Sequence, residues 1–294
     1  HRDLHSFPTR RSSDLNCWVR NWLSFSSYEK LSKKRELGRF FRKLLSMIIP
    51  VVGMHRSGTS TVAGILHLNG VLMGSEKTFR PKPLPQNPKG FYENLDFRKV
   101  NDRILSHHNY DVKSYSIDIP DVKATGRLRR KMKQLLSKYS TEYQNWGWKD
   151  PRTCLTLNLW LNELKGLGFL TETRILVVVR NEISVARSLY LRNELPLEIG
   201  LKLWMSYYMR ALEAIDKYDV QVMYYRYEDI VSNSIESCRS IFSSFKLPFD
   251  DKIVSGFVDP KLDRSRGIPE EDNFQISVLD DVVQFRNNLY SRFS

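Results

Sequence analysis

A short stretch of glycine, arginine and hydroxyl residues follows an apolar segment in the first quarter of the chain. Gly53 and Gly58 are separated by four residues, and Arg56 lies between them. Thr59 and Ser60 follow directly. A glycine-bounded turn before a helix directs several backbone N–H groups and the positive end of the helix dipole toward one point. The types and spacing of these residues therefore predict a binding site for phosphate or sulfate.

This loop differs from that of a nucleotide triphosphatase at one informative position. A Walker A loop has the same glycine spacing but continues with Lys and then Ser or Thr, where this chain has Thr59 and Ser60. The missing lysine would contact the β- and γ-phosphates, so its absence indicates a ligand without a γ-phosphate. From the loop alone, a turn that binds no ligand stays open as an alternative.

The loop resembles the 5′-phosphosulfate loop of the sulfotransferases, in which a basic residue, a small residue and glycine precede hydroxyl residues. The sulfuryl donor of that family is 3′-phosphoadenosine 5′-phosphosulfate. The resemblance implies that six consecutive residues contact this donor: His55, Arg56, Ser57, Gly58, Thr59 and Ser60.

Two later segments resemble the same family and would complete the donor site. Arg180 ends an apolar, β-branched segment, and Ser188 follows eight residues later. In sulfotransferases an Arg and a Ser with this spacing hold the 3′-phosphate, and a planar guanidinium suits phosphate because it donates paired hydrogen bonds. Tyr227 follows another apolar segment, and the resemblance places it near the adenine.

The resemblance also implies catalytic roles. Lys149 precedes Asp-Pro after a short apolar segment, and in tyrosylprotein sulfotransferases such a lysine reaches the transferring sulfuryl group. Arg56 would stabilise charge on the same group. An acidic residue at a similar offset from the loop glycine serves the family as general base, which points to Glu76, eighteen residues after Gly58. Glu93, in a segment common in bacterial members, is the second candidate base.

Length and composition set further limits. The 294 residues are enough for one α/β domain with a substantial core. No apolar run approaches the roughly 20 residues that cross a bilayer. The three cysteines, Cys17, Cys154 and Cys238, have neither metal-ligand spacing nor the density of a disulfide framework. We therefore expect a cytoplasmic protein without a metal site.

The start of the chain differs in composition from the rest. Residues 1–15 resemble the translation of a sequencing-library adapter, and we treat them as artefactual. Residues 16–46 form a basic extension whose authenticity the sequence leaves open, since positions 16–45 hold eight Lys or Arg residues against two Glu residues. Such a segment could lie on anionic lipid, although a solvated extension is the more common outcome. The sulfotransferase-like domain is expected to span residues 47–294.

The candidate residues need elements that bring them together. Four apolar segments are typical of buried strands: 48–52, 146–149, 174–180 and 220–225. Helices are predicted at 94–107, 122–139, 155–164, 195–215, 235–245 and 277–293, and a long surface loop at 71–90. This order predicts a three-layer α/β fold of the P-loop type, with a mainly parallel central sheet flanked by helices. Ligands in such sheets bind beyond the carboxyl ends of the strands.

The sequence thus leads to a sulfotransferase hypothesis with two rivals. The enzyme would move a sulfuryl group from 3′-phosphoadenosine 5′-phosphosulfate to an acceptor hydroxyl of a carbohydrate or another small molecule, without metal or nucleic acid. One rival is a P-loop kinase with an altered Walker loop. The other is a non-enzymatic polyanion or nucleic-acid binder, since the net charge is +13. The acceptor and the oligomeric state stay open.

Overall fold

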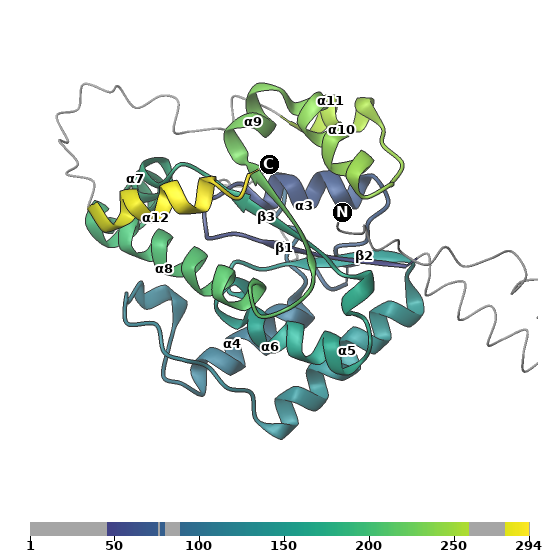
Figure 1. Ribbon diagram of the computed structural model, residues 1–294, viewed down its shortest axis with the longest axis horizontal. Coiled ribbons are helices and arrows are strands. Elements are labelled where there is room, and N and C mark those ends of the chain that lie inside the picture. The colour runs from purple at the N-terminus through teal and green to yellow at the C-terminus, as the bar shows by residue number, and fades with distance from the viewer. Residues whose placement is uncertain (1–45, 76, 80–88, 259–279, 294) are drawn as a thin grey trace, which may run out of the picture. The chain divides into compact units, whose positions relative to one another are not determined.

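The computed structural model describes residues 46–75, 77–79, 89–258 and 280–293 (Figure 1). Glu76 and nearly all of the expected N-terminal segments lie outside these residues. A single parallel sheet organises the described part. Its strands are β1 (Met47–Val52), β2 (Asn145–Lys149), β3 (Arg174–Val179) and β4 (Gln221–Arg226), in the spatial order β2-β1-β3-β4. All three pairings are parallel, which confirms the predicted α/β class.

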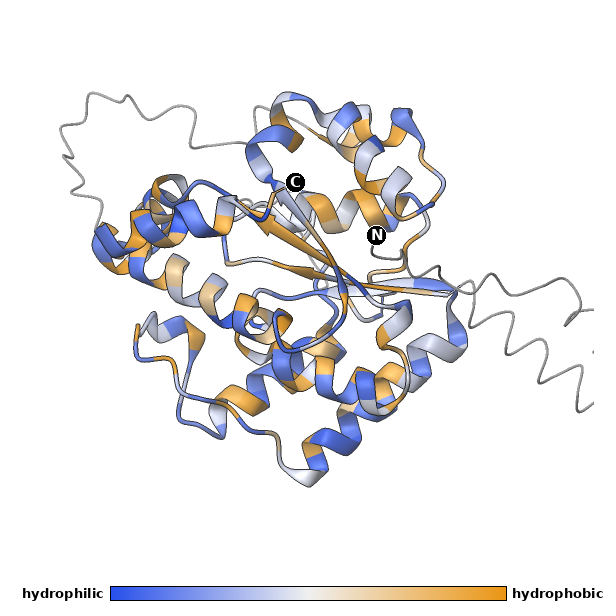
Figure 2. Cartoon of the chain, viewed as in Figure 1, coloured by the Kyte–Doolittle hydropathy of each residue, from blue (hydrophilic) through white to orange (hydrophobic). Residues whose placement is uncertain are grey.

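The central strands β1 and β3 are buried on both faces because their apolar side chains alternate between two cores, whereas the edge strand β4 is partly exposed. Ile48 and Val52 of β1 belong to one core, while Ile49 and Val51 belong to the other. Each of these side chains is at most 1% exposed. Figure 2 shows β1 and β3 largely in orange, as expected for the centre of a sheet covered on both sides.

Helices form the two outer layers (Figure 1). The core on one face receives apolar residues from α3 (Thr59–Leu68), α9 (Tyr227–Ser232), α10 (Ser234–Ser244) and α11 (Asp251–Phe257). The larger core on the other face receives them from α4 (Leu95–Ser106), α5 (Gly126–Glu142), α6 (Thr153–Gly166), α7 (Glu182–Asn193), α8 (Leu197–Ile215) and α12 (Asp280–Tyr290). Short 3₁₀ turns occur at Val112–Ser114 and Leu170–Glu172. Among the described residues, no helix combines the length and apolarity needed to cross a membrane.

Aromatic rings fix α4 and α6 against the edge strand β2. Phe97 stacks on Trp148, with ring centroids 4.7 Å apart and an angle of 10° between the planes. Trp160 of α6 lies 5.0 Å from Phe97. All three rings are fully buried. Because Trp148 directly precedes Lys149, this stack fixes the end of β2 where the candidate lysine begins.

The structure corrects two sequence predictions. The segment 71–90 was expected to be a surface loop, but Val71 and Met73 at its start are completely buried. Leu72 accepts a hydrogen bond from the N–H of Gly147 and donates one to Asn145 O, so extended backbone covers the outer side of β2. The helix predicted from 122 begins instead at Gly126, because the Thr125 hydroxyl caps it by accepting from Leu128 N.

Gly147 offers a test of this packing. A Cβ atom there would lie 1.9 Å from the carbonyl oxygen of Ile49, which is backbone of the neighbouring strand. We expect Gly147→Ala to lower the free energy of unfolding by at least about 2 kcal/mol, since overpacked cores typically lose about 1–3 kcal/mol. Gly166→Ala is the matched control, because a Cβ there meets nothing within 4 Å. Urea denaturation that shows equal stability for the two variants would contradict the packing described.

Candidate functional site

The loop between β1 and α3 has a backbone that few residues adopt. Gly58, directly before α3, has φ 79°, and Arg56 has φ 71°, a left-handed conformation that is uncommon for a residue with a side chain. A Cβ on Gly58 would lie 1.9 Å from the ring of Tyr227, and a Cβ on Gly53 would lie 2.5 Å from Val178 O. Glycine is therefore required at both ends of the loop, because the Tyr227 ring and the backbone of β3 approach it too closely for a side chain.

Two aromatic residues of α8 hold the loops after β1 and β3. The hydroxyl of Tyr208 donates to Val178 O at 2.7 Å and lies 3.0 Å from the buried Ser57 hydroxyl. Trp204 donates from its indole nitrogen to Arg180 O at 3.0 Å. Both side chains are completely buried, and nothing in the sequence indicated that their polar atoms would contact two loops.

The predicted donor-binding residues come together at the carboxyl edge of the sheet. The Arg56 side chain donates from Nε to Ser188 Oγ at 2.8 Å. Arg180 donates from Nη1 to the carbonyl oxygen of Arg56 at 3.0 Å. The guanidinium carbon of Arg180 also lies 4.9 Å from the centre of the Tyr227 ring. Residues from three strand ends thus share one set of contacts.

Lys149 forms a second cluster on the other side of the loop. Its ammonium group lies 3.0 Å from Ser60 Oγ and 3.1 Å from Glu93 Oε1. The second Glu93 oxygen lies 3.3 Å from Arg98. Lys149 is only 3% exposed, so its charge is fixed in place by these partners. Two residues predicted to be catalytic, Lys149 and Glu93, therefore contact each other directly.

The carboxylate of Glu93 is ionised throughout the ordinary pH range. Burial alone raises its pKa, but the charge and hydrogen bond of Lys149, together with the charge of Arg98, outweigh burial and lower the pKa to about 2. Ion pairing of this strength makes the carboxylate a poor proton acceptor.

A buried polar network supports the turn that follows Lys149. Asp150, with no exposed surface, accepts hydrogen bonds from Asn101 Nδ2 at 2.8 Å and from Arg152 Nη1 at 2.9 Å. Arg152 also lies 2.5 Å from Asp102. Burial raises the pKa of Asp150, while the Arg152 charge acts in the opposite direction. Sequence reasoning missed Asn101 and Asp102, since nothing in α4 marks them as partners of a turn about fifty residues later.

His55 lies next to both clusters as a neutral imidazole. Burial, reinforced by the Arg152 charge, lowers its pKa to about 3. Its ring meets the Tyr207 ring edge-on at 5.9 Å. Its Nε2 atom is buried without a hydrogen-bond partner among the described residues.

The predicted site residues thus fall into two groups around one loop. Arg56, Arg180, Ser188 and Tyr227 form the first group, and Lys149, Ser60 and Glu93 form the second. Ser57 in the loop and Thr59 at the start of α3 are buried. The structure does not place Glu76. Within the described residues, no three His, Cys, Asp or Glu side chains are grouped so that they could hold a metal ion.

Solved structures of known proteins share the fold of this chain. The chain is similar in fold to the sulfotransferase domain of the curacin biosynthetic pathway, with 14% identity, a TM-score of 0.52, and coverage of 85% of this chain and 99% of that one. It is also similar to the sulfotransferase domain of the Synechococcus PCC 7002 olefin synthase, with 12% identity, a TM-score of 0.52, and coverage of 83% and 94%. No curated protein matches the chain.

The family comparison covers all the groups described above. A family model described as "Sulfotransferase family" matches residues 49–251, which is well over half of the chain. The matched range includes the loop after β1 and the ends of the other three strands. The protein therefore belongs to the sulfotransferase family of enzymes.

Proposed function

We propose that the protein transfers a sulfuryl group from 3′-phosphoadenosine 5′-phosphosulfate to the hydroxyl of a carbohydrate or another small molecule. The observation that carries this proposal is the pair of contacts from Arg56 to Ser188 and from Arg180 to the Arg56 backbone. These contacts join the loop suited to a phosphosulfate to the two residues suited to the 3′-phosphate. A donor with anionic groups at both ends of one nucleoside fits this combination.

Each group of the site has a proposed part in donor binding. The N–H groups of the loop and the N-terminus of α3 would hold the 5′-phosphosulfate. Arg180 and Ser188 would bind the 3′-phosphate, and Tyr227, which already lies against the Arg180 guanidinium, would contact the adenine. His55 would contribute through the backbone of the loop, since its Nε2 atom is buried.

Lys149 would act at the point of transfer. During in-line attack the acceptor oxygen bonds to sulfur, the bond from sulfur to the phosphate oxygen breaks, and negative charge grows on the departing oxygen. The buried Lys149 ammonium group, beside Ser60 at the start of α3, would stabilise that charge, with Arg56 as a second cation. Fixed donors of this kind contribute on the order of 10²–10³ in rate.

The acceptor hydroxyl must lose a proton to a general base. The two candidates for this role, Glu93 and Glu76, are not equally suited to it. Glu93 is paired with both Lys149 and Arg98, so we assign it to orient the lysine. Glu76 remains the proposed general base, on the spacing found in the sequence. A base with access to the acceptor would contribute about 10²–10⁴ in rate.

The two rivals meet specific difficulties. A kinase needs a lysine where Thr59 stands, and Thr59 is 4% exposed within the start of α3. A simple polyanion binder gives no reason for the contacts that join Arg180, Arg56 and Ser188 in one network.

Three ligands separate the candidates in a thermal-shift titration. Since a ligand at a hundred times its Kd stabilises the folded state by about 2.7 kcal/mol, 3′-phosphoadenosine 5′-phosphate should raise Tm by about 5–10 °C. ATP with Mg²⁺ and a single-stranded oligonucleotide should raise it much less. A larger response to ATP with Mg²⁺ would favour the kinase, and a larger response to the oligonucleotide would favour the polyanion binder.

Substitution of Arg180 tests the proposed donor site most directly. We expect Arg180→Ala to weaken 3′-phosphoadenosine 5′-phosphate binding about 10- to 100-fold, because a hydrogen bond to a charged group contributes about 1.5–3 kcal/mol. Arg180→Lys should retain part of the affinity, since it keeps the charge without the planar fork. Arg239→Ala, at an exposed cation of α10 paired with Asp251, is the control. Calorimetry that gives Arg180→Ala the affinity of the control would remove Arg180 from the donor site.

The lowered pKa of Glu93 predicts that the free energy of unfolding depends on pH. Its pKa is lowered on folding from 4.5 to about 2, so the ionised form stabilises the folded state above pH 4.5, and this stabilisation disappears as pH falls toward 2. At about 1.4 kcal/mol for each pKa unit, the effect is on the order of 3 kcal/mol. Glu93→Gln should therefore be clearly less stable than wild type at pH 7, with a difference that shrinks on acidification.

The matched control for this experiment is Glu198→Gln. Glu198 pairs with Lys202 on the surface of α8, with a 59% exposed side chain, so its loss should change stability by less than about 1 kcal/mol at any pH. Urea denaturation between pH 3 and 7 measures both. A Glu93→Gln difference that stays constant with pH would show that the carboxylate is not held as described.

A further inference from the structure

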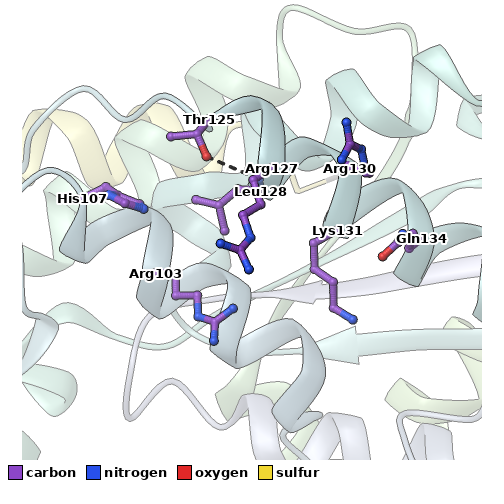
Figure 3. Close-up of a pocket in the computed structure, with 8 residues that line it drawn as sticks. All are labelled: Arg103, His107, Thr125, Arg127, Leu128, Arg130, Lys131 and Gln134. Atoms are coloured by element: carbon purple, nitrogen blue, oxygen red, sulfur yellow. Dashed lines mark hydrogen bonds between the residues drawn. The ribbon is translucent and has the colours of Figure 1, made fainter.

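A pocket of about 650 Å³ lies between α4 and α5, away from the groups described above (Figure 3). Figure 3 shows the side chains of Arg103, Arg127 and Lys131 extending into the space between the two helices. The complete lining consists of Arg103, His107, Thr125, Arg127, Leu128, Arg130, Lys131 and Gln134. Its volume falls within the range of about 300–1,000 Å³ that is usual for ligand sites.

Every ionisable side chain of this pocket is basic. The described residues supply no acidic partners that would balance the positive charge of its Arg and Lys side chains. In the described part of the chain, no ion pair involves Arg103, Arg127, Arg130 or Lys131. Two other cations of α5 behave differently, because Arg129 and Lys133 lie 2.6 Å and 3.5 Å from Glu163. The cations of α5 that face Glu163 are thus balanced by its carboxylate, while the cations of α5 that face the pocket keep their positive charge. Clustered like charges repel one another, so an anion would stabilise this arrangement.

The residues that line the pocket indicate which class of anionic ligand it could bind. Leu128 is its single apolar residue, so the pocket offers little to the apolar side chains that usually anchor a bound peptide. It contains no Phe, Tyr or Trp ring, the side chains on which nucleic-acid bases stack most strongly. It is also concave and lacks the apolar face with which a protein surface enters a membrane. Guanidinium forks with a hydroxyl and an amide suit a ligand that carries both oxyanions and hydroxyl groups.

We propose that this pocket binds the sulfate or carboxylate groups of an acidic oligosaccharide. Arg103, Arg127 and Arg130 would pair with the oxyanions, while Thr125 and Gln134 are placed to hydrogen-bond sugar hydroxyls.

Helix α4 relates this pocket to the transfer centre. Glu93 lies just before the helix, and Arg103 lies ten residues further along, about 15 Å at 1.5 Å per residue. One sugar residue cannot occupy both places, so the pocket would hold a charged part of the acceptor at a distance from the reacting hydroxyl. This assignment as an acceptor anchor rests on the proposed function, whereas oligosaccharide binding to the pocket does not.

The test is an equilibrium titration of the full chain with a size-defined heparin oligosaccharide, in the presence of saturating 3′-phosphoadenosine 5′-phosphate so that the donor site is filled. The pocket variant is Arg103→Gln/Arg127→Gln/Arg130→Gln. The matched control, Lys165→Gln/Lys217→Gln/Lys252→Gln, removes the same charge from exposed positions elsewhere. We expect the pocket variant to bind at least about tenfold more weakly than wild type, with a shallower salt dependence, and the control to bind within about twofold.

Several outcomes would overturn the proposal. They are equal affinities of the pocket and control variants, no saccharide binding by wild type, and tighter binding of a charge-matched oligonucleotide or of anionic lipid vesicles. The nucleotide thermal shift of the pocket variant separates this proposal from the proposed function. A normal nucleotide shift together with lost saccharide binding would support both the pocket proposal and the proposed function. Saccharide binding by wild type without any nucleotide shift would support the pocket proposal but contradict the proposed donor site.

Discussion

The hydrogen bond from Arg180 to the backbone of Arg56 is the contact on which the arrangement of the proposed donor site depends. It joins the turns after β1 and β3, which are neighbours in the sheet although more than a hundred residues separate them in the chain. The chain first leaves β1 for β2 on one side and later returns to form β3 on the other side. At such a switch point no connection covers the strand ends, so a crevice is left for a ligand. The side chains that line it can belong to both halves of the fold.

Burial of charge is the second constraint on the site. Lys149, Glu93, Asp150 and Arg152 are all at most 7% exposed, and each has an oppositely charged neighbour. Replacing a whole buried ion pair by apolar residues often costs little stability, whereas removing one partner is costly because the other charge is then buried without compensation. Their value here is positional, since a paired lysine cannot move to solvent. The aromatic stack of Phe97 and Trp148 gives the same turn its apolar support.

Much of this arrangement could be predicted from the sequence, because it depends on local patterns. Buried strands show as apolar runs, and the residues that follow parallel strands must meet at one edge, which placed Lys149, Arg180 and Tyr227 correctly relative to the sheet. Contacts between distant segments left no such pattern. The pairing of Glu93 with Lys149, the support of Asp150 by Asn101 and the tie from Tyr208 to Val178 O depend on how helices pack. The burial of Val71 and Met73 was missed for the same reason, since Pro- and Lys-rich residues after them suggested a surface loop.

The left-handed backbone of Arg56 sets the stability of the turn against its proposed use. Glycine would adopt φ 71° without strain, whereas a residue with a side chain loses roughly 1–3 kcal/mol there. The chain accepts this conformational penalty and keeps a cation in the turn. A glycine at this position would relieve the strain, but it would also remove the guanidinium that contacts Ser188. Conformational stability and the proposed binding of the donor therefore favour different residues at one position.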